Sequence, residues 1–408
     1  MSNDTQPEIR FPGFTDDWEE RKLGDVGNTF TGLTGKTKED FGHGSAKFVT
    51  YVNVFQNPIA TLDQLDAIEI DEKQNQVQKG DIFFTTSSET PEEVGMSSVW
   101  THDTENVYLN SFTFGYRPRV SFDLNYMASM LRSPSIRKKI TFLAQGISRY
   151  NISKTKMLEI KIPTPTLSEQ EKIGSFFKQL DDTIALHQRK LDLLKETKKG
   201  FLQKMFPKNG AKVPEIRFPG FTGDWEQRKL GDVLSERNDQ TPETNEYPLM
   251  SFVQGKGVTP KGERYNRSFL VKDSEKKYKK TELGDFIYSS NNLETGSIGF
   301  NRTGKAVISP VYSIFKSKKS RESQFIGIMS ARKDFISKMV RFRQGVVYGQ
   351  WRIHESDFLN IDMKMPNDKE QQLIISFFEN IDKTIALHQR KLDLLKETKK
   401  GFLQKMFV

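Results

Sequence analysis

Some residues of this 408-residue chain have the types and part of the spacing that nucleotide chemistry needs. The segment GLTGKTK (32–38) ends in a Gly-Lys-Thr step, as a phosphate-binding loop does. Such a loop needs a further glycine five positions before Gly35, and that residue is Phe30. We therefore interpret Lys36 and Lys38 as lysines of a surface loop, not as part of a nucleotide-hydrolysing site.

Methyl transfer and metal chemistry find no better pattern. A nucleic-acid methyltransferase would need an Asn/Asp-Pro-Pro-aromatic motif, and Asn57-Pro58-Ile59 lacks both the second proline and the aromatic residue. The chain has no cysteine, which excludes thiol nucleophiles, disulfides and zinc–cysteine clusters. Its five histidines form no HxxxH pair, and no PD…(D/E)xK nuclease signature stands out. The sequence thus predicts a binding protein with no metal site and no catalytic residue.

The charge balance suggests a partner. The formal net charge is +9, which favours nucleic acid, although a merely solvated basic surface remains the alternative. No run of 18 apolar residues is present, and MSNDTQPEIR at the start lacks an apolar signal region. We expect a cytoplasmic protein with no membrane-spanning segment, for which nucleic acid is one candidate partner.

The chain consists of two copies of one unit. The opening segment PEIRFPGFTDDWEERKLGDV (7–26) returns at 214–233, where only Asp16 and Glu20 are replaced, by Gly223 and Gln227. The closing segment TIALHQRKLDLLKETKKGFLQKMF (183–206) returns at 384–407 without a substitution. The sequence between them differs, so each unit has a constant beginning, a variable body and a constant end.

The variable bodies share a pattern of short apolar runs. The pairs 46–54 and 246–254, 80–88 and 284–292, and 111–118 and 311–318 are rich in β-branched and aromatic residues, which predicts strands. A helical stretch follows in each (126–143 and 325–342), and then a glycine-marked loop (145–157 and 344–358). We therefore predict an α+β fold with two similar globular domains.

Each unit ends in a long helix. Ser168 with Glu171 forms a capping-box pattern for the first helix, and Asn367 or Asp368 is the candidate cap of the second. About 38 residues at 1.5 Å per residue give a rod of roughly 57 Å. A stripe this long needs a partner, and the simplest one is the other copy, running antiparallel as a coiled-coil spacer.

The apolar residues of both helices keep a seven-residue period, which defines the predicted seam. The seam of the first helix is Ile173, Phe177, Leu180, Ile184, His187, Leu191, Leu194, Phe201 and Met205. The seam of the second is Ile374, Phe378, Ile381, Ile385, His388, Leu392, Leu395, Phe402 and Met406. Packing or switching roles suit its two histidines better than catalysis.

This order of motifs resembles the DNA-specificity subunit of type I restriction–modification systems. The carriers are the W-E-x-R-K-L-G-D-V segments (18–26 and 225–233), the helix starts (165–173 and 366–374) and the repeated closing segment. The resemblance covers nearly the whole chain. It implies domains at 1–165 and 209–365 that recognise DNA targets, with spacer helices at 166–208 and 366–408.

The resemblance also implies function. Each recognition domain would read one half of a split DNA site, and the spacer helices would dock two methyltransferase subunits, with two restriction subunits joining. S-adenosylmethionine, ATP and magnesium would belong to those partners, so no cofactor is expected in this chain. Two readers one helical turn apart, about 34–36 Å, are typical of dimeric DNA-binding proteins. Because the two bodies differ, the site should be asymmetric.

Residues that read DNA should be polar and lie where the bodies differ. The first body offers Lys36, Lys38, Ser87, Ser88, Arg149, Tyr150, Asn151 and Lys154. The second offers Arg237, Asn238, Gln240, Asn291, Asn292, Tyr348, Gln350 and Arg352, with Trp351 expected to pack instead.

Two other classes stay open on sequence alone. One is a scaffold with two peptide- or sugar-binding bodies on a coiled coil, which would show no steep salt dependence of DNA binding. The other is an autonomous nuclease or methyltransferase, which would turn over without partners.

Overall fold

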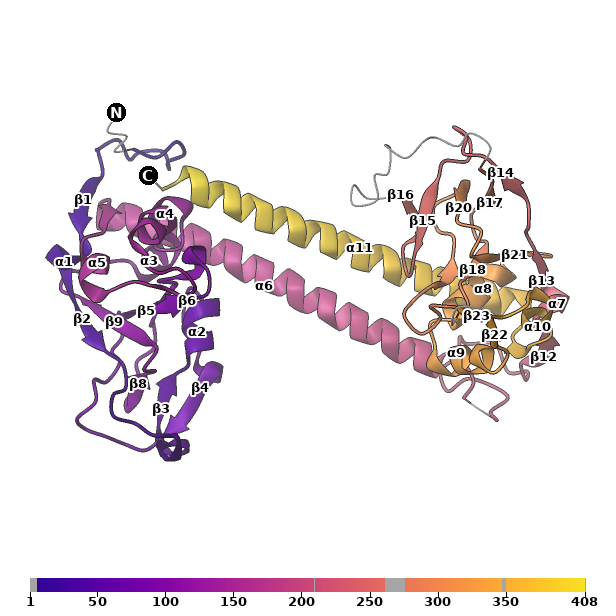
Figure 1. Cartoon of the computed structure of the whole chain (residues 1–408), viewed down its shortest axis with the longest axis horizontal. Coiled ribbons are helices and arrows are strands. Elements are labelled where there is room, and N and C mark those ends of the chain that lie inside the picture. The colour runs from indigo at the N-terminus through magenta and orange to yellow at the C-terminus, as the bar shows by residue number, and fades with distance from the viewer. Residues whose placement is uncertain (1–5, 209, 261–275, 347–349, 408) are drawn as a thin grey trace. The chain divides into compact units, whose positions relative to one another are not determined.

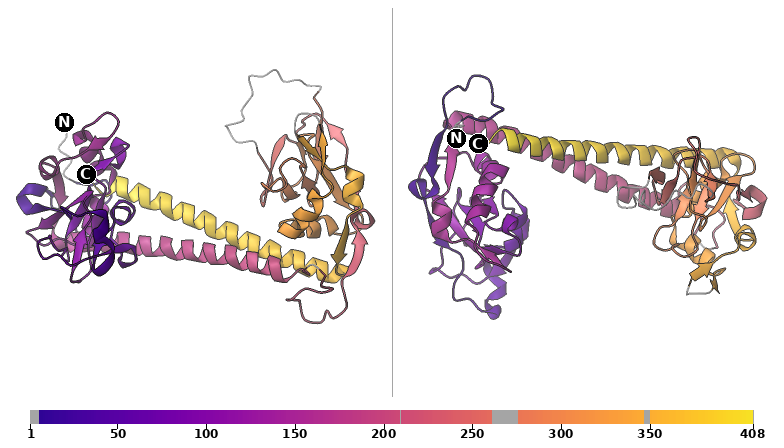
Figure 2. Two further views of the ribbon diagram at one scale, coloured as in Figure 1. Left: turned by 60° about the horizontal axis from the view of Figure 1, so that its bottom comes forward. Right: turned by 45° about the horizontal axis from the view of Figure 1, so that its top comes forward.

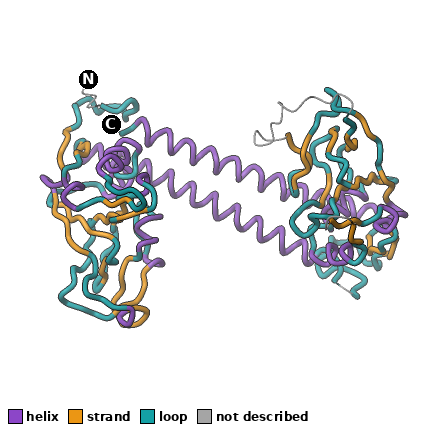
Figure 3. The backbone as a smooth tube through the Cα atoms, in the orientation of Figure 1, coloured by secondary structure: helices purple, strands orange, loops and turns teal. Residues whose placement is uncertain are grey.

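The computed structural model describes residues 6–208, 210–260, 276–346 and 350–407. The chain divides into two compact units, which we call unit 1 (1–188 with 389–408) and unit 2 (189–388). Each unit contains one globular body and a segment of both long helices (Figure 1). Helices and strands alternate irregularly in both bodies (Figure 3), so the predicted α+β class is confirmed.

The two long helices are α6 (Leu167–Lys204) and α11 (Asp368–Lys405). The expected cap Ser168 is wrong: it lies inside the helix, and the Thr166 hydroxyl accepts from the Glu169 N–H at 3.4 Å. For α11 the cap is Asn367, whose side chain accepts from the Glu370 N–H at 3.0 Å. The helix starts therefore follow the side chain that reaches the first free amides.

The body of unit 1 is built on a four-stranded antiparallel sheet in the order β2-β9-β5-β7. A second sheet has the order β4-β3-β8. The strands of this body are β1 (Glu19–Lys22), β2 (Gly27–Thr31), β3 (Phe41–Val49), β4 (Leu65–Ile68), β5 (Ile82–Thr85), β6 (Ser87–Ser88), β7 (Ser97–Val99), β8 (Val107–Leu109), β9 (Thr113–Pro118), β10 (Tyr150–Asn151) and β11 (Lys161–Thr164). Its helices are α1 (Leu23–Val26), α2 (Tyr51–Gln56), α3 (Leu124–Met130), α4 (Pro134–Leu143) and α5 (Lys154–Leu158), with short 3₁₀ turns at Lys38–Asp40, Leu62–Gln64 and Pro91–Glu93.

One predicted strand of unit 1 is only half right. The strand expected over 46–54 ends at Val49, and α2 follows it. The Thr50 side chain accepts from the Asn53 N–H at 3.2 Å, which starts a helix in place of further pairing. This turn brings Tyr51 toward the end of β5, with consequences for the site described below.

The body of unit 2 repeats the four-stranded sheet and the helices that follow it, but differs elsewhere: β15 pairs with β16 and β22 pairs with β23. Its four-stranded sheet is β13-β21-β18-β19, and a three-stranded sheet has the order β14-β17-β20. Its strands are β12 (Glu226–Lys229), β13 (Leu234–Glu236), β14 (Gln240–Thr241), β15 (Met250–Val253), β16 (Gly257–Pro260), β17 (Tyr278–Thr281), β18 (Phe286–Tyr288), β19 (Ile298–Phe300), β20 (Ala306–Ile308), β21 (Ser313–Ser317), β22 (Gln344–Val346), β23 (Gln350–Arg352) and β24 (Asp362–Met365). Its helices are α7 (Leu230–Val233), α8 (Glu322–Met329), α9 (Lys333–Val340) and α10 (Glu355–Leu359).

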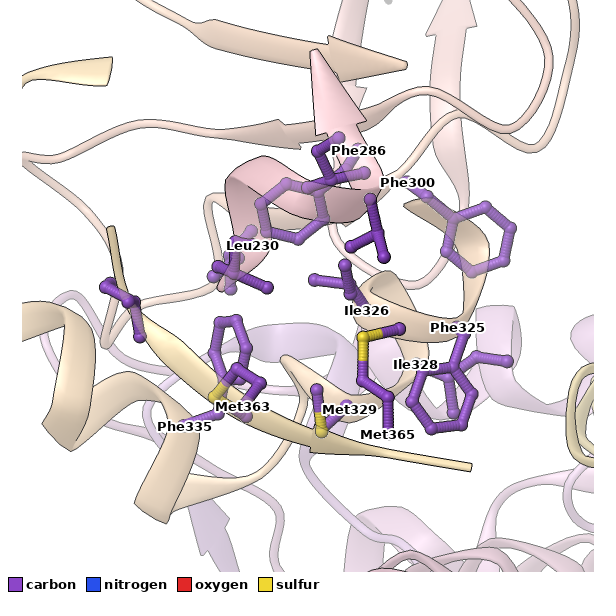
Figure 4. Close-up of a cluster of buried hydrophobic side chains, with 14 of the residues drawn as sticks. Leu230, Phe286, Phe300, Phe325, Ile326, Ile328, Met329, Phe335, Met363 and Met365 are labelled. Carbon is purple, nitrogen blue, oxygen red and sulfur yellow. The ribbon is translucent and has the colours of Figure 1, made fainter. Parts of the chain in front are cut away.

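Aromatic and methionine side chains fill the core of unit 2. Phe286 of β18 and Phe300 of β19 lie with Ile326 and Met329 of α8 in one buried cluster (Figure 4). The same cluster includes Phe378 of α11 and Phe206 just after α6. The body is thus packed onto its helical segments by a continuous apolar core.

Within each unit the segments of α6 and α11 run antiparallel, side by side (Figures 1 and 2). In unit 1, Phe176 meets Phe402 edge-on at 4.9 Å, and the Lys399 ammonium lies 2.5 Å from Asp181. In unit 2 the equivalent contacts are Phe201 with Phe377 at 4.9 Å and Lys198 with Asp382 at 2.5 Å. The residues of the predicted seam are buried or half-buried at every position.

The constant opening segment ties the two helices together at their ends. In unit 1 the Ile9 N–H donates to the Lys405 carbonyl at the end of α11, at 3.0 Å. The next residue, Arg10, holds Glu169 in the first turn of α6 with two hydrogen bonds of 2.7 and 2.8 Å. The Trp18 indole N–H donates to the same carboxylate at 3.1 Å, and Glu169 is 1% exposed.

Unit 2 repeats the main-chain and arginine contacts of this clamp with α6 and α11 exchanged, whereas its Trp225 indole N–H makes no hydrogen bond within the described residues. The Ile216 N–H donates to the Lys204 carbonyl at 2.9 Å, and Arg217 makes two 2.7 Å hydrogen bonds to Glu370. An antiparallel pair puts the end of one helix beside the start of the other, so one short segment reaches both. This geometry explains why the opening segment and the helices are repeated together.

Loss of the buried carboxylate should loosen one unit. We expect Glu169→Ala to destabilise unit 1 by roughly 2–4 kcal/mol, because Arg10, whose side chain is 12% exposed, would lose its carboxylate partner and the Trp18 N–H its acceptor. Hydrogen exchange of unit 1 amides measures the effect, and Glu171→Ala, at an exposed position of the same turn, is the matched control. Equal protection in the two variants would contradict the role given to the clamp.

Candidate nucleic-acid interface

In unit 1 the structure brings two of the predicted segments together. The buried strand β5 continues into β6, which pairs with β10 so that Tyr150 faces Ser88 and Asn151 faces Ser87. The Ile152 N–H donates to the Thr86 carbonyl at 3.0 Å and extends this contact. Main-chain pairing therefore places four candidate residues from distant parts of the sequence on one surface.

The segment before β10 folds back as a tight hairpin. Gln145 and Asn151 exchange main-chain hydrogen bonds of 2.9 and 2.8 Å. Gly146 has φ +143°, and a Cβ there would lie 2.0 Å from the Arg149 carbonyl oxygen, so the position requires glycine. The hairpin exposes Arg149 at its tip beside Ile147, which is 95% exposed.

Tyr51, which sequence reasoning missed, also supports β6. Its hydroxyl donates to the Ser87 carbonyl at 3.1 Å. Burial raises the pKa of Tyr51, and the nearby Glu93 carboxylate raises it further. The Ser88 hydroxyl donates to Glu93 at 2.9 Å. The Thr50 cap was a sequence signal for the start of α2, but nothing in the sequence indicated the contact of Tyr51 with Ser87.

Unit 2 builds the same surface with side-chain contacts. Beyond β18, the Asn291 side-chain oxygen accepts from the Trp351 N–H at 2.6 Å, and the Ser290 hydroxyl accepts from the Ile353 N–H at 3.0 Å. Trp351 lies in β23, whose hairpin partner is β22. Asn291, Asn292, Gln350 and Arg352 thus belong to one region, whereas Tyr348 lies outside the described residues.

The expected packing role of Trp351 is wrong. Its side chain is 48% exposed, whereas Trp18, Trp100 and Trp225 are at most 4% exposed. The Arg343 guanidinium lies 6.0 Å from the Trp351 ring and makes two 2.7 Å hydrogen bonds to Glu294, which lower the pKa of that carboxyl. Trp351 therefore presents a large aromatic surface to solvent beside a held arginine.

Two of the candidate cations are engaged within the protein. Lys36 lies 2.8 Å from Asp71, and hydrogen bonds from Lys36 and Gln74 lower the pKa of Asp71 to about 2. Arg237, 12% exposed, lies 2.7 Å from Asp285 and 3.0 Å from Glu282. Because both charges are paired with carboxylates of the protein, we assign these two side chains a structural role in their loops before any role in DNA contact.

The remaining candidates are placed less closely. Lys38, Asn238 and Gln240 are exposed, but no described contact joins them to the hairpins. Lys154 begins α5, three residues beyond β10, and is half-buried. Arg352 is 56% exposed, with its nearest carboxylate, Glu355, at 3.7 Å.

The long helices carry an exposed feature that the sequence analysis did not single out. Each has two leucines seven residues apart that lie one position before a seam residue. They are Leu186 (45% exposed) and Leu193 (67%) on α6, and Leu387 (67%) and Leu394 (60%) on α11. Their period in the repeated closing segment was the available signal.

Other kinds of site were also sought. Within the described ranges, no group of three or more His, Cys, Asp or Glu side chains is arranged to hold a metal ion. Among the described helices, none is long and apolar enough to cross a membrane.

Comparison with known proteins identifies the family. A family model described as the type I restriction modification DNA specificity domain matches residues 15–196 and again 222–397. The type I restriction enzyme MjaX specificity subunit of Methanocaldococcus jannaschii is 23% identical, over 95% of this chain and 92% of that protein. The MjaVIII specificity subunit of the same organism is 24% identical, over 66% and 67% of the two chains.

Solved structures agree on the fold. The S subunit of a type I restriction–modification system from M. genitalium superposes with a TM-score of 0.64 at 14% identity, over 99% of each chain. A chain from a structure on complex assembly and conformational transition of the type I R-M system gives a TM-score of 0.52 at 16% identity, over 97% of each chain.

The class defined by two target-recognition bodies on paired helices is that of DNA-recognition subunits of restriction–modification systems. This chain belongs to the type I restriction–modification DNA specificity family. It is therefore a non-catalytic subunit that recognises DNA sequence and assembles with other subunits of such a system. The predicted family and the non-enzymatic role are confirmed.

The support given by Asn291 can be tested directly. Asn291→Ala removes the acceptor for the Trp351 N–H, and a hydrogen bond of this kind contributes about 0.5–1.5 kcal/mol. We expect amide exchange at Trp351 to accelerate by roughly threefold to tenfold. Asn292→Ala is the neighbouring control, and the same acceleration in both variants would argue against this specific contact.

Proposed function

We propose that the two hairpin surfaces read the two halves of a bipartite, asymmetric DNA site. Reading surface 1 is Ser87, Ser88, Arg149, Tyr150 and Asn151; reading surface 2 is Asn291, Asn292, Gln350, Trp351 and Arg352. One observation carries the proposal: in both units the same two segments meet at the end of the equivalent buried strand, yet the side chains they present differ. Equivalent placement with different chemistry is what two readers of unlike half-sites need.

The exposed side chains suit base recognition. Arginine pairs with guanine through two hydrogen bonds, and asparagine or glutamine pairs with adenine in the same way. Reading surface 1 exposes Arg149 and Asn151, and reading surface 2 exposes Gln350 and Arg352. The net charge of +9 supports attraction to phosphate, which positions a protein on DNA without specifying sequence.

The exposed leucines of α6 and α11 support docking of partner subunits. A leucine that is two-thirds exposed on a long helix gains free energy when a partner covers it. Each helix carries the pair in the repeated closing segment, so the two copies offer identical chemistry to two identical partners. We assign these sites to two methyltransferase subunits, which two restriction subunits join in the cytoplasm. S-adenosylmethionine, ATP and magnesium would be bound by those partners.

Arginine truncation should affect one half-site at a time. We expect Arg149→Ala and Arg352→Ala each to weaken specific binding by about 1–3 kcal/mol and to relax discrimination at one base pair, in different half-sites. Competition binding on duplexes with single base-pair changes measures both effects. Arg21→Ala, at a half-exposed arginine of β1, is the control.

Equal losses on specific and random duplexes would contradict base reading by either arginine. Occupancy of reading surface 2 has its own probe, because Trp351 is the half-exposed tryptophan among the four. A duplex that carries the second half-site should protect it from acrylamide quenching. Binding with no negative salt dependence would contradict DNA recognition as a whole.

Leucine truncation should affect assembly and spare DNA contacts. We expect Leu193→Ala and Leu387→Ala each to weaken capture of the methyltransferase subunit by roughly tenfold, since each removes apolar area from the proposed interface. Sedimentation of the mixed subunits measures assembly. Leu62→Ala, 48% exposed in the body of unit 1, is the matched control. Unchanged assembly in both helix variants would place the docking surface elsewhere.

A further inference from the structure

Ile147 is the feature of reading surface 1 that hydrogen-bond recognition leaves unexplained. Its side chain is 95% exposed, in a loop whose other tip residues are Gly146, Ser148 and Arg149. A branched apolar side chain gains nothing from this position in the free protein. An exposed isoleucine at the tip of a structured recognition hairpin therefore calls for an apolar partner.

The hairpin holds Ile147 in a defined place. Gln145 and Asn151 close it with two main-chain hydrogen bonds, and β10 fixes it against β6. Two further exposed apolar residues lie in segments that bond to this region: Phe112 (62%), whose carbonyl accepts from the Thr86 N–H at 3.1 Å, and Val52 (51%), which follows Tyr51 in α2. The surface around β6 is thus a mixture of apolar and hydrogen-bonding groups.

Base edges in the major groove offer one apolar group, the C5-methyl of thymine. That groove is wide enough to admit a two-stranded β-ribbon. The loop at 145–151, which a single antiparallel bridge between Gln145 and Asn151 closes, is the exposed element that we place in it. Arg149 and Asn151, on either side of Tyr150, supply hydrogen bonds for adjoining bases. Resting on the proposed function of reading surface 1, we propose that Ile147 packs against the methyl group of a thymine in the first half-site.

The proposal separates two kinds of recognition within one hairpin. The polar side chains select bases by hydrogen bonds, whereas Ile147 selects thymine over cytosine and over uracil by contact with the methyl group. Covering one such group corresponds to a factor of about four in affinity. The effect should be confined to one base pair, because the tip carries a single large apolar side chain.

Replacement of thymine by deoxyuridine tests the contact, since it removes the methyl group and keeps every hydrogen-bonding group. The target sequence is first defined by mapping the adenines that the assembled system methylates. The half-site in which the Arg149→Ala variant loses base discrimination is taken as the first half-site. Each thymine of that half-site is then replaced in turn, and binding of the full-length chain, with its partner subunits, is measured. We expect one replacement to weaken wild-type binding about fourfold.

Ile147→Ala completes a double-mutant cycle. The variant should bind the thymine duplex more weakly than the wild type by a similar factor. Replacing the thymine by deoxyuridine should not weaken its binding any further. Ile70→Ala, at a 49% exposed isoleucine beyond β4, should bind both duplexes as the wild type does. Circular dichroism confirms that each variant is folded.

Several outcomes would overturn the proposal. One is a first half-site without thymine. Another is a double-mutant cycle in which the affinity losses from Ile147→Ala and from the deoxyuridine replacement simply add. A third is an Ile147→Ala variant that loses partner assembly while it keeps DNA affinity. Each of them leaves sequence-specific binding through Arg149 intact, so the proposed function would stand. Loss of specific binding by the wild-type chain itself would overturn both.

Discussion

Antiparallel pairing of α6 and α11 is the constraint on which the rest of the structure depends. Exposure of either apolar stripe to water would be unfavourable, and the two helices bury these residues against each other. Pairing in this direction brings the end of one helix next to the start of the other. The opening segment then reaches both, through Ile9 and Arg10 in unit 1 and through Ile216 and Arg217 in unit 2. Each body follows directly from that clamp, so its position on the helices is set by the pairing.

The register of the pairing has its own devices. Lys198 and Lys399 interrupt the apolar seams, and each finds an aspartate of the other helix, Asp382 or Asp181. Half-exposed ion pairs contribute little net free energy, but a lysine in an apolar seam is costly wherever its partner is missing. A shift of one helix by a turn would separate both pairs. The aspartates stand just before the repeated closing segment, at the same offset as the lysines, so the two units enforce one register.

The order of the two bodies and the two long helices along the chain could be predicted from the sequence, because repeats and helical periodicity are visible in the sequence itself. Contacts that join distant segments could not be predicted. Nothing local indicates that Arg237 will contact Asp285, or that the Trp351 N–H will donate to the Asn291 side chain. The helix cap at Thr166 was missed by two positions, since Ser168 also suited the pattern. Both β6 and β10 lie in segments that were predicted to contain DNA-reading residues, but no sequence rule predicted that the two strands would pair.

The two reading surfaces differ in how readily their specificity can change. In unit 1 the hairpin is held by main-chain bonds, such as that from Ile152 to Thr86, and the Tyr51 hydroxyl holds β6, the strand with which β10 pairs. Its polar side chains are therefore free to vary without loss of the support. In unit 2 the Asn291 side chain holds the hairpin, yet it also belongs to the surface that we assign to DNA. A substitution there alters chemistry and geometry together, so unit 1 is the body in which a new base preference requires fewer compensating changes.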